Sequence, residues 1–182
     1  MARCAWPLTK QPALHLVGVR RVPARAPPHP AQVTTVVEAM SGWSEEMLVP
    51  INETADREGC KHLGPNEVVT PTGFKEAYNQ YVEGGWQGLS YEEKWGGQGL
   101  PQSISLVMAE IIATANWTWG MFPGLSRGAA NTILDNGSPE LQEKYLPQLV
   151  SGEWTGTMCL TEPQCGSDLA QVATKAIPQD DG

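Results

Sequence analysis

The sequence lacks the features that mark several large classes of protein. No segment approaches the roughly 20 continuous apolar residues that span a bilayer, so we expect no membrane span. Zinc sites and thioredoxin motifs use the spacings CxxC and HExxH. The four cysteines form no CxxC pair and the three histidines form no HExxH motif. We therefore expect no metal site, and reduced thiols in a cytoplasm-like compartment are the simplest account of the cysteines.

Motifs for phosphate binding and nucleophilic catalysis are missing as well. The glycine-rich stretches GGWQG and GGQG fit neither the phosphate-loop pattern nor GxGxxG after a strand. Ser126 stands in GLSRG, but no strand precedes it, and a nucleophile elbow joins a strand to a helix. The sequence therefore favours neither a P-loop nucleotide-binding protein nor a serine hydrolase.

Basic residues are few outside the first 37 positions. The chain has 12 Lys and Arg against 20 Asp and Glu, a formal net charge of -8. The first 37 residues contain five of the basic side chains and no acid, so the remainder is strongly acidic. A phosphate backbone attracts a clustered basic face. The charge pattern therefore argues against binding to nucleic acid.

Residues 1–32 form a basic head that we set apart from the fold. Its stretch RVPARAPPHP contains prolines that block a helix and arginines that cannot be buried unpaired. The head is a transit peptide, a disordered basic tail, or translated sequence that does not belong to the functional product. Transit peptides are rich in serine, whereas the first serine here is Ser41, so we favour a misplaced start or a frame error.

Apolar side chains recur near helical spacing from residue 33 to residue 56. This pattern predicts an amphipathic helix, which Pro50 ends or kinks because it removes an amide donor and clashes with the preceding turn. The following stretch, REGCKHLGPNEVVTPTG, predicts a loop with a short extended piece at Val68 and Val69.

A second helix is predicted from Thr72, as its N-cap, to the glycines at 84 and 85. Its apolar stripe consists of Phe74, Ala77, Tyr78 and Tyr81. The glycine-rich stretch WQGLSYEEKWGGQGLP then predicts a tight, irregular turn.

Residues 102–115 are apolar on nearly every side, which predicts a helix inside a bundle. Glu110 is the only charge in this helix, and we expect a structural carboxylate there rather than a catalytic one. A fourth helix is predicted over 123–134 with a stop at Gly137. Ser138 caps a fifth helix that has proline at its first position. The expected core stripe of the fifth helix is Leu141, Tyr145, Leu146 and Leu149.

Strand composition replaces the helical period after Gly152, in EWTGTMCL. The predicted fold class is therefore α+β, a helical bundle followed by the first strands of an incomplete β domain. The expected division is a head over 1–32, a helical domain over 33–152 and the start of a β domain over 153–182.

The stretch CLTEPQCGSD combines rigid and permissive backbone with hydroxyl groups. Pro163 fixes one backbone angle, and Gly166 permits conformations closed to other residues. Thr161 and Ser167 add hydroxyls, so the loop could clamp the polar edge of a cofactor at the end of a strand. A plain β-turn in which Ser and Asp cap the backbone is the alternative, and spacing alone favours that turn.

Together with its flanks, this loop resembles the acyl-CoA dehydrogenase family. The resemblance rests on LTEPQCGSD, LPQLVSGEWTGTMC and YEEKWGGQGLP and covers residues 36–176. REGC, GFKEAY, GGWQGL and SGEWTGTMCLTEP resemble the 3-(methylthio)propanoyl-CoA dehydrogenase branch. The resemblance implies an N-terminal helical domain, a central β domain and a C-terminal helical domain, with FAD and acyl-CoA between them. It also implies an electron-transferring flavoprotein as partner, a homo-oligomer, and a cytoplasmic or mitochondrial-matrix location.

The resemblance assigns roles to five residues of the loop. Met158 and Leu160 would line the flavin, and Thr161 would hydrogen-bond its edge through backbone and hydroxyl. Gly166 and Ser167 would close the loop where FAD and the acyl-CoA chain pass, so Ser167 would also contact the substrate.

No catalytic residue is expected in these 182 residues. The family takes its glutamate base from the C-terminal domain, so Glu162 is given no catalytic role. Cys159 points away from the flavin side of the expected strand and would be a packed core thiol. Two other functions stay open: a helical interaction module without cofactor, and a flavoprotein of the acyl-CoA oxidase type.

Overall fold

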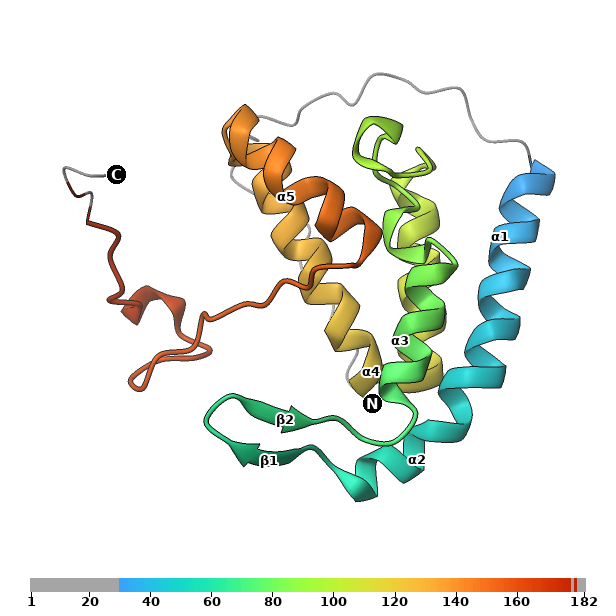
Figure 1. Ribbon diagram of the computed structural model, residues 1–182, viewed down its shortest axis with the longest axis horizontal. Coiled ribbons are helices and arrows are strands. Elements are labelled where there is room, and N and C mark those ends of the chain that lie inside the picture. Colours follow the sequence, from blue (N-terminus) through green and yellow to red (C-terminus); the bar gives the residue numbers. More distant parts are fainter. Residues whose placement is uncertain (1–29, 178, 180–182) are drawn as a thin grey trace, which may run out of the picture.

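The computed structural model describes residues 30–177 and residue 179, and the basic head before residue 30 lies outside them. Five α-helices pack around one another, a two-stranded hairpin lies at one end, and an extended segment leaves the bundle (Figure 1). No helix among the described residues is long and apolar enough to cross a membrane.

The first helical stretch contains three joined pieces. Helix α1 spans Pro30–Trp43, one π-helical turn spans Ser44–Leu48, and α2 spans Val49–Glu58. Residues 30–32, which we had assigned to the basic head, are therefore helical. Pro50 lies in the first turn of α2, a position at which helices tolerate proline. The helix therefore does not end at Pro50, and its irregularity is the π turn just before the proline.

The hairpin follows α2 and was only half predicted. Strands β1, Lys61–Gly64, and β2, Glu67–Val69, are antiparallel, with Lys61 opposite Val69 and His62 opposite Val68. The extended piece at Val68 and Val69 is confirmed. Strand β1 was missed because KHLG has no alternating pattern, and the structure leaves both strands largely exposed.

Helix α3 spans Phe74–Glu83 and is capped differently from the prediction. Its N-cap is Gly73 at φ 89°, and no side chain caps the helix. Thr72 instead donates its amide to Glu58 Oε2 at 2.8 Å, which ties the end of the hairpin to α2. The predicted end at Gly84 is confirmed.

The irregular turn before α4 folds back on itself. The amides of Gly99 and Leu100 donate to the carbonyls of Tyr91 and Leu89, both at 2.8 Å. Gly97 lies so close to Tyr91 that a Cβ on the glycine would be 2.2 Å from the Tyr91 carbonyl oxygen. This turn therefore depends on a close approach between two backbone segments.

Helix α4, Gln102–Asn136, has two arms that meet at a kink. Asn116, at φ -160° and ψ 94°, is the non-helical residue between them. Its Oδ1 accepts from the Trp119 amide at 3.0 Å, and its Nδ2 donates to the Leu48 carbonyl at 3.4 Å. The two helices predicted over 102–115 and 123–134 are thus one helix with a kink, and its second arm begins before Pro123.

The outer face of the first arm is less enclosed than predicted. Ile104, Met108 and Ile112 are buried in the bundle, whereas Leu106 is 70% exposed. Glu110 is also exposed, as a carboxylate at the rim of the bundle would be. The helix therefore packs on one face within the described part of the chain.

Helix α5, Pro139–Ser151, packs on the second arm of α4. The predicted cap is confirmed, because Ser138 Oγ accepts from the Leu141 amide at 3.4 Å. Leu146 and Leu149 are buried as expected, but Leu141 is exposed and does not belong to the core stripe.

The core contains two groups of buried side chains. The larger joins α1, the π turn, α3, the first arm of α4 and the start of its second arm, and includes Met40, Leu48, Tyr81 and Trp119. The smaller joins the irregular turn, the second arm of α4 and α5: Tyr91, Ala130, Leu146, Leu149 and Val150. Side chains of α4 belong to both groups, so this helix lies at the centre of the packing.

Candidate functional site

The site predicted from the sequence lies on the segment that leaves α5, which the structure anchors at two points. The Gly152 carbonyl accepts from the Tyr78 hydroxyl at 2.9 Å. Four residues later the Gly156 amide donates to Ser126 Oγ at 3.1 Å. Gly156 is close to α4, since a Cβ there would be 2.5 Å from the Ala129 Cβ. Ser126 is thus a buried anchor inside a helix, not a nucleophile.

Beyond Gly156 the segment leaves the bundle (Figure 1). Within the described residues, its part from 157 to 161 has no hydrogen-bonded partner strand, although strand composition is present. A single extended segment needs a neighbouring strand to satisfy its backbone groups. The amides and carbonyls of this segment are therefore available to another strand or to a ligand.

The predicted flavin-side residues all lie on the surface. Met158 is 63% exposed and Leu160 is 39% exposed. Thr161, Gly166 and Ser167 are exposed too. The expectation for Cys159 was wrong, because this thiol is also exposed. The physical reason is that the segment is not covered on either face, so alternation along it does not separate a buried side from an exposed one.

The loop after Thr161 closes on itself through Glu162. The backbones of Glu162 and Cys165 exchange two hydrogen bonds, at 2.8 and 3.1 Å. The Glu162 carboxylate accepts from the amides of Ala173 and Thr174 at 3.0 and 2.9 Å. Hydrogen bonds from Thr174 and Ala173 favour the charged form and lower the pKa of Glu162 to about 2. Glu162 therefore holds the two ends of the loop together.

Asp168 and Gln164 complete the closure. Asp168 caps a short 3₁₀ turn, Leu169–Gln171, by accepting from the Ala170 amide at 3.2 Å. Gln164 donates to the Gln171 carbonyl at 3.3 Å. Of the local capping by Ser and Asp that the alternative interpretation expected, the structure shows the part of Asp168. The hydroxyls of Thr161 and Ser167, in contrast, make no hydrogen bond within the described residues, so they remain available.

In the Glu162→Gln variant we expect the amides of Ala173 and Thr174 to exchange their hydrogens faster than in the wild type. The folded pKa is depressed, so the carboxylate contributes fully above its ordinary pKa of 4.5, and the contribution is lost as the pH falls towards about 2. Hydrogen exchange read by NMR checks this. Protection of both amides should decline between pH 4.5 and 2 in the wild type only.

Asp168→Asn is the matched control for this variant, because its carboxylate accepts from Ala170 rather than from the two distal amides. Equal exchange at Ala173 in the wild type and in Glu162→Gln would show that the carboxylate does not close the loop.

Comparison with known proteins decides the family. Residues 34–153 match the description "Acyl-CoA dehydrogenase, N-terminal domain". The chain belongs to the acyl-CoA dehydrogenase family. The 3-methylmercaptopropionyl-CoA dehydrogenase of Ruegeria pomeroyi is 42% identical over 146 residues, which cover 80% of this chain and 25% of that protein. This acyl-CoA dehydrogenase chain thus spans about a quarter of the length of that curated relative.

Solved structures show the same fold. A chain in the structure of the electron transferring flavoprotein of Acidaminococcus fermentans has a TM-score of 0.68 at 20% identity, and the likeness covers 86% of this chain and 38% of that one. An acyl-CoA dehydrogenase from Bacillus anthracis, complexed with FAD, has a TM-score of 0.64 at 22% identity, with 81% and 24% covered. The predicted fold class is confirmed by these likenesses.

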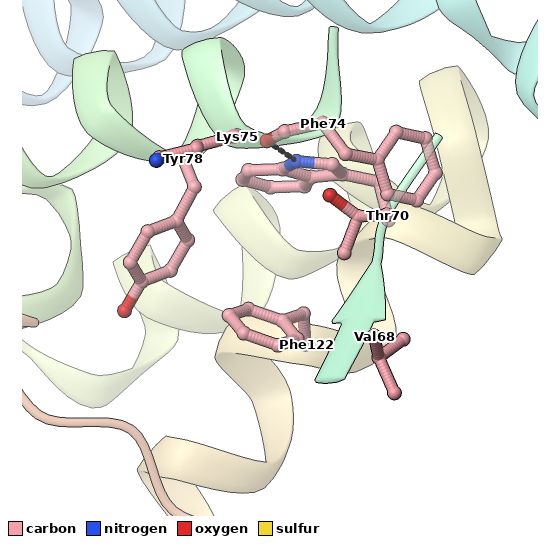
Figure 2. A pocket seen from close by; sticks show the side chains of 7 residues that line it. Val68, Thr70, Phe74, Lys75, Tyr78 and Phe122 are labelled. Atoms are coloured by element: carbon pink, nitrogen blue, oxygen red, sulfur yellow. Dashed lines mark hydrogen bonds between the residues drawn. The ribbon is translucent and has the colours of Figure 1, made fainter. Parts of the chain in front are cut away.

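The helical part of this acyl-CoA dehydrogenase chain also contains two cavities. The first, of about 280 Å³, lies between the hairpin, α3 and α4 (Figure 2). Trp119, which also lines this cavity, donates its Nε1 hydrogen to the Phe74 carbonyl at 3.2 Å. Lys75 is the charged side chain in its lining and is exposed to solvent. The second cavity lies between the two arms of α4.

Sequence reasoning found the exposed residues of the loop but not its anchors. The contacts of Ser126 with Gly156 and of Glu162 with Ala173 and Thr174 join residues 30, 11 and 12 positions apart. The signals that could have indicated them are the small residue at 156, which permits a close approach, and a carboxylate beside Pro163.

Proposed function

We propose that residues 157–167 form one wall of the FAD site of an acyl-CoA dehydrogenase that introduces a double bond next to an acyl-CoA thioester. The observation that carries the proposal is the exposed, unpaired segment with its free polar groups, held against α4 at Gly156. Membership of the family supports the assignment.

The residues present fit an isoalloxazine ring. Met158 and Leu160 offer apolar surface to the ring system, and Thr161 offers a free hydroxyl and amide to its polar edge. Gly166 has no positive φ, and a Cβ there would be 3.5 Å from Thr161 Cγ2, which is ordinary contact. The loop itself does not require glycine at 166, so close approach by a ligand is the reason we assign to it, with Ser167 beside the substrate.

Bound FAD would supply the acceptor for a hydride from the acyl β carbon. The chain's own residues would bind and orient the ring. Glu162 is not the base, because two backbone amides engage its carboxylate and a pKa of about 2 makes it a weak proton acceptor at neutral pH. We therefore place the glutamate base outside these residues, in a C-terminal domain.

The substrate we propose is 3-(methylthio)propanoyl-CoA, because the relative at 42% identity bears that activity in its name. We also propose an electron-transferring flavoprotein as electron acceptor, a homo-oligomeric protein, and a cytoplasmic location with the mitochondrial matrix as alternative. In this arrangement residues 33–152 are the helical domain and residues 153–182 begin the β domain.

The test is to express the chain extended by its downstream coding sequence to the length of its relatives. We expect a yellow protein that retains FAD and whose flavin is bleached by 3-(methylthio)propanoyl-CoA. The double variant Thr161→Val, Ser167→Ala should retain less FAD, with Ser151→Ala as a control outside the loop. A folded but colourless extended protein would refute the proposal. If the extended protein is yellow, reoxidation of its reduced flavin by oxygen alone would indicate an oxidase.

A further inference from the structure

The cavity between the two arms of α4 has a volume of about 200 Å³. Gly120 and Gly124 on the second arm leave it open, and Ile112 and Trp117 provide apolar walls. Its remaining lining residues are Tyr81, Ala109, Ala113, Met121, Pro123 and Arg127. A space of this size and lining fits a small ligand with an apolar body.

Arg127 is the only charged residue that lines this cavity in the described part of the chain. Its Nε is buried and has no hydrogen-bond partner. One terminal nitrogen donates to the Ser105 carbonyl at 3.4 Å, and no carboxylate lies within ion-pair distance among the described residues. Arg127 as a whole is partly buried, and charged side chains that are withdrawn from water are normally paired. The guanidinium therefore lacks a counter-ion.

The neighbouring phenols do not supply the missing negative charge. Burial raises the pKa of Tyr81, whose hydroxyl donates to Gln87 Oε1 at 2.9 Å. Burial also raises the pKa of Tyr91 to about 12, so both rings are neutral at physiological pH. Neither phenol balances Arg127.

We propose that this cavity binds a small organic carboxylate, with the carboxylate on Arg127 and the apolar body between the two arms of α4. Arg127 is matched to a carboxylate because its planar donors pair with two oxygens. This site goes beyond the proposed flavin wall, which comprises residues 157–167. In the first cavity Lys75 is exposed, so water already satisfies its charge.

Isothermal titration of the 182-residue chain with hexanoate tests the proposal, with 1-hexanol as the neutral probe. We expect saturable binding of hexanoate that exceeds the binding of 1-hexanol. Arg127→Met should weaken hexanoate binding by about tenfold to a hundredfold, the range of charge-assisted hydrogen bonds. Lys75→Met, which alters the other cavity, should leave it unchanged.

Gly124→Leu provides a second variant that keeps Arg127. A Cβ at Gly124 meets nothing within 4 Å, so the side chain should fill the cavity without disturbing the fold and abolish hexanoate binding. Far-ultraviolet circular dichroism tests whether each variant is folded. If Arg127→Met does not fold, the binding measured with Gly124→Leu decides the question. Equal binding of hexanoate and 1-hexanol, or undiminished binding in Gly124→Leu, would overturn the proposal.

Discussion

Replacing Trp119 by alanine is expected to lower the free energy of unfolding by about 3–5 kcal/mol, the usual range for a buried aromatic residue. Trp119 is 1% exposed in the larger core group. Its ring centroid lies 5.5 Å from those of Trp43 and Tyr81, and its Nε1 donates to the Phe74 carbonyl. The variant would lose these ring contacts, leave a cavity and free a buried carbonyl.

Urea unfolding followed by circular dichroism measures this change. Trp117→Ala is the control, because Trp117 belongs to the same arm of α4 and is 67% exposed. Its effect should stay within about 0.5 kcal/mol, as for most surface substitutions. Similar urea midpoints of unfolding for the two variants would mean that Trp119 does not stabilise the core.

The second large effect is expected for Gly97→Ala, which should cost about 3 kcal/mol, the upper end of overpacking. The new Cβ would lie 2.2 Å from the Tyr91 carbonyl oxygen and 2.4 Å from its carbon. Both are backbone atoms, so no rotamer change relieves the contact. The turn that holds Tyr91 against Asn131, by a hydrogen bond of 2.8 Å, would have to move.

Thermal unfolding of Gly97→Ala beside Gly42→Ala checks this expectation. Gly42 lies in α1 with nothing within 4 Å of an added Cβ, and alanine there should raise stability by up to about 1 kcal/mol. The two substitutions should therefore shift the melting temperature in opposite directions. A shift of the same sign and size for both would contradict the close approach at Gly97.

The helices were predictable from local pattern, and their junctions were not. Ser138 capped α5 as expected, because a cap depends on residues three positions away. Thr72 is not the cap, because α3 begins one residue later with Gly73 as its N-cap, and Thr72 instead donates its amide to Glu58, 14 residues earlier. The kink of α4 occurs at Asn116, whose side chain bonds Leu48 across 68 positions. Such long-range hydrogen bonds have no signature in the local spacing.

In the candidate site, too, the composition of the loop was predictable from the sequence and its contacts were not. The sequence indicated which residues of the loop carry hydroxyls, glycine and apolar groups, and the structure exposes them. The state of Cys159 depended on whether other strands cover the segment, which alternation alone does not reveal. The part played by Glu162 depended on amides that follow it by 11 and 12 positions.

The two arms of α4 meet at Asn116, whose side chain bonds both the second arm and the Leu48 carbonyl. The second arm carries Gly124 and Arg127 in the wall of the cavity and, between them, Ser126 as the anchor of Gly156. Any change in the angle between the arms therefore displaces the cavity wall and the loop segment together. One arm of a single helix therefore carries both the wall of the cavity and the attachment point of the segment that begins at Gly156.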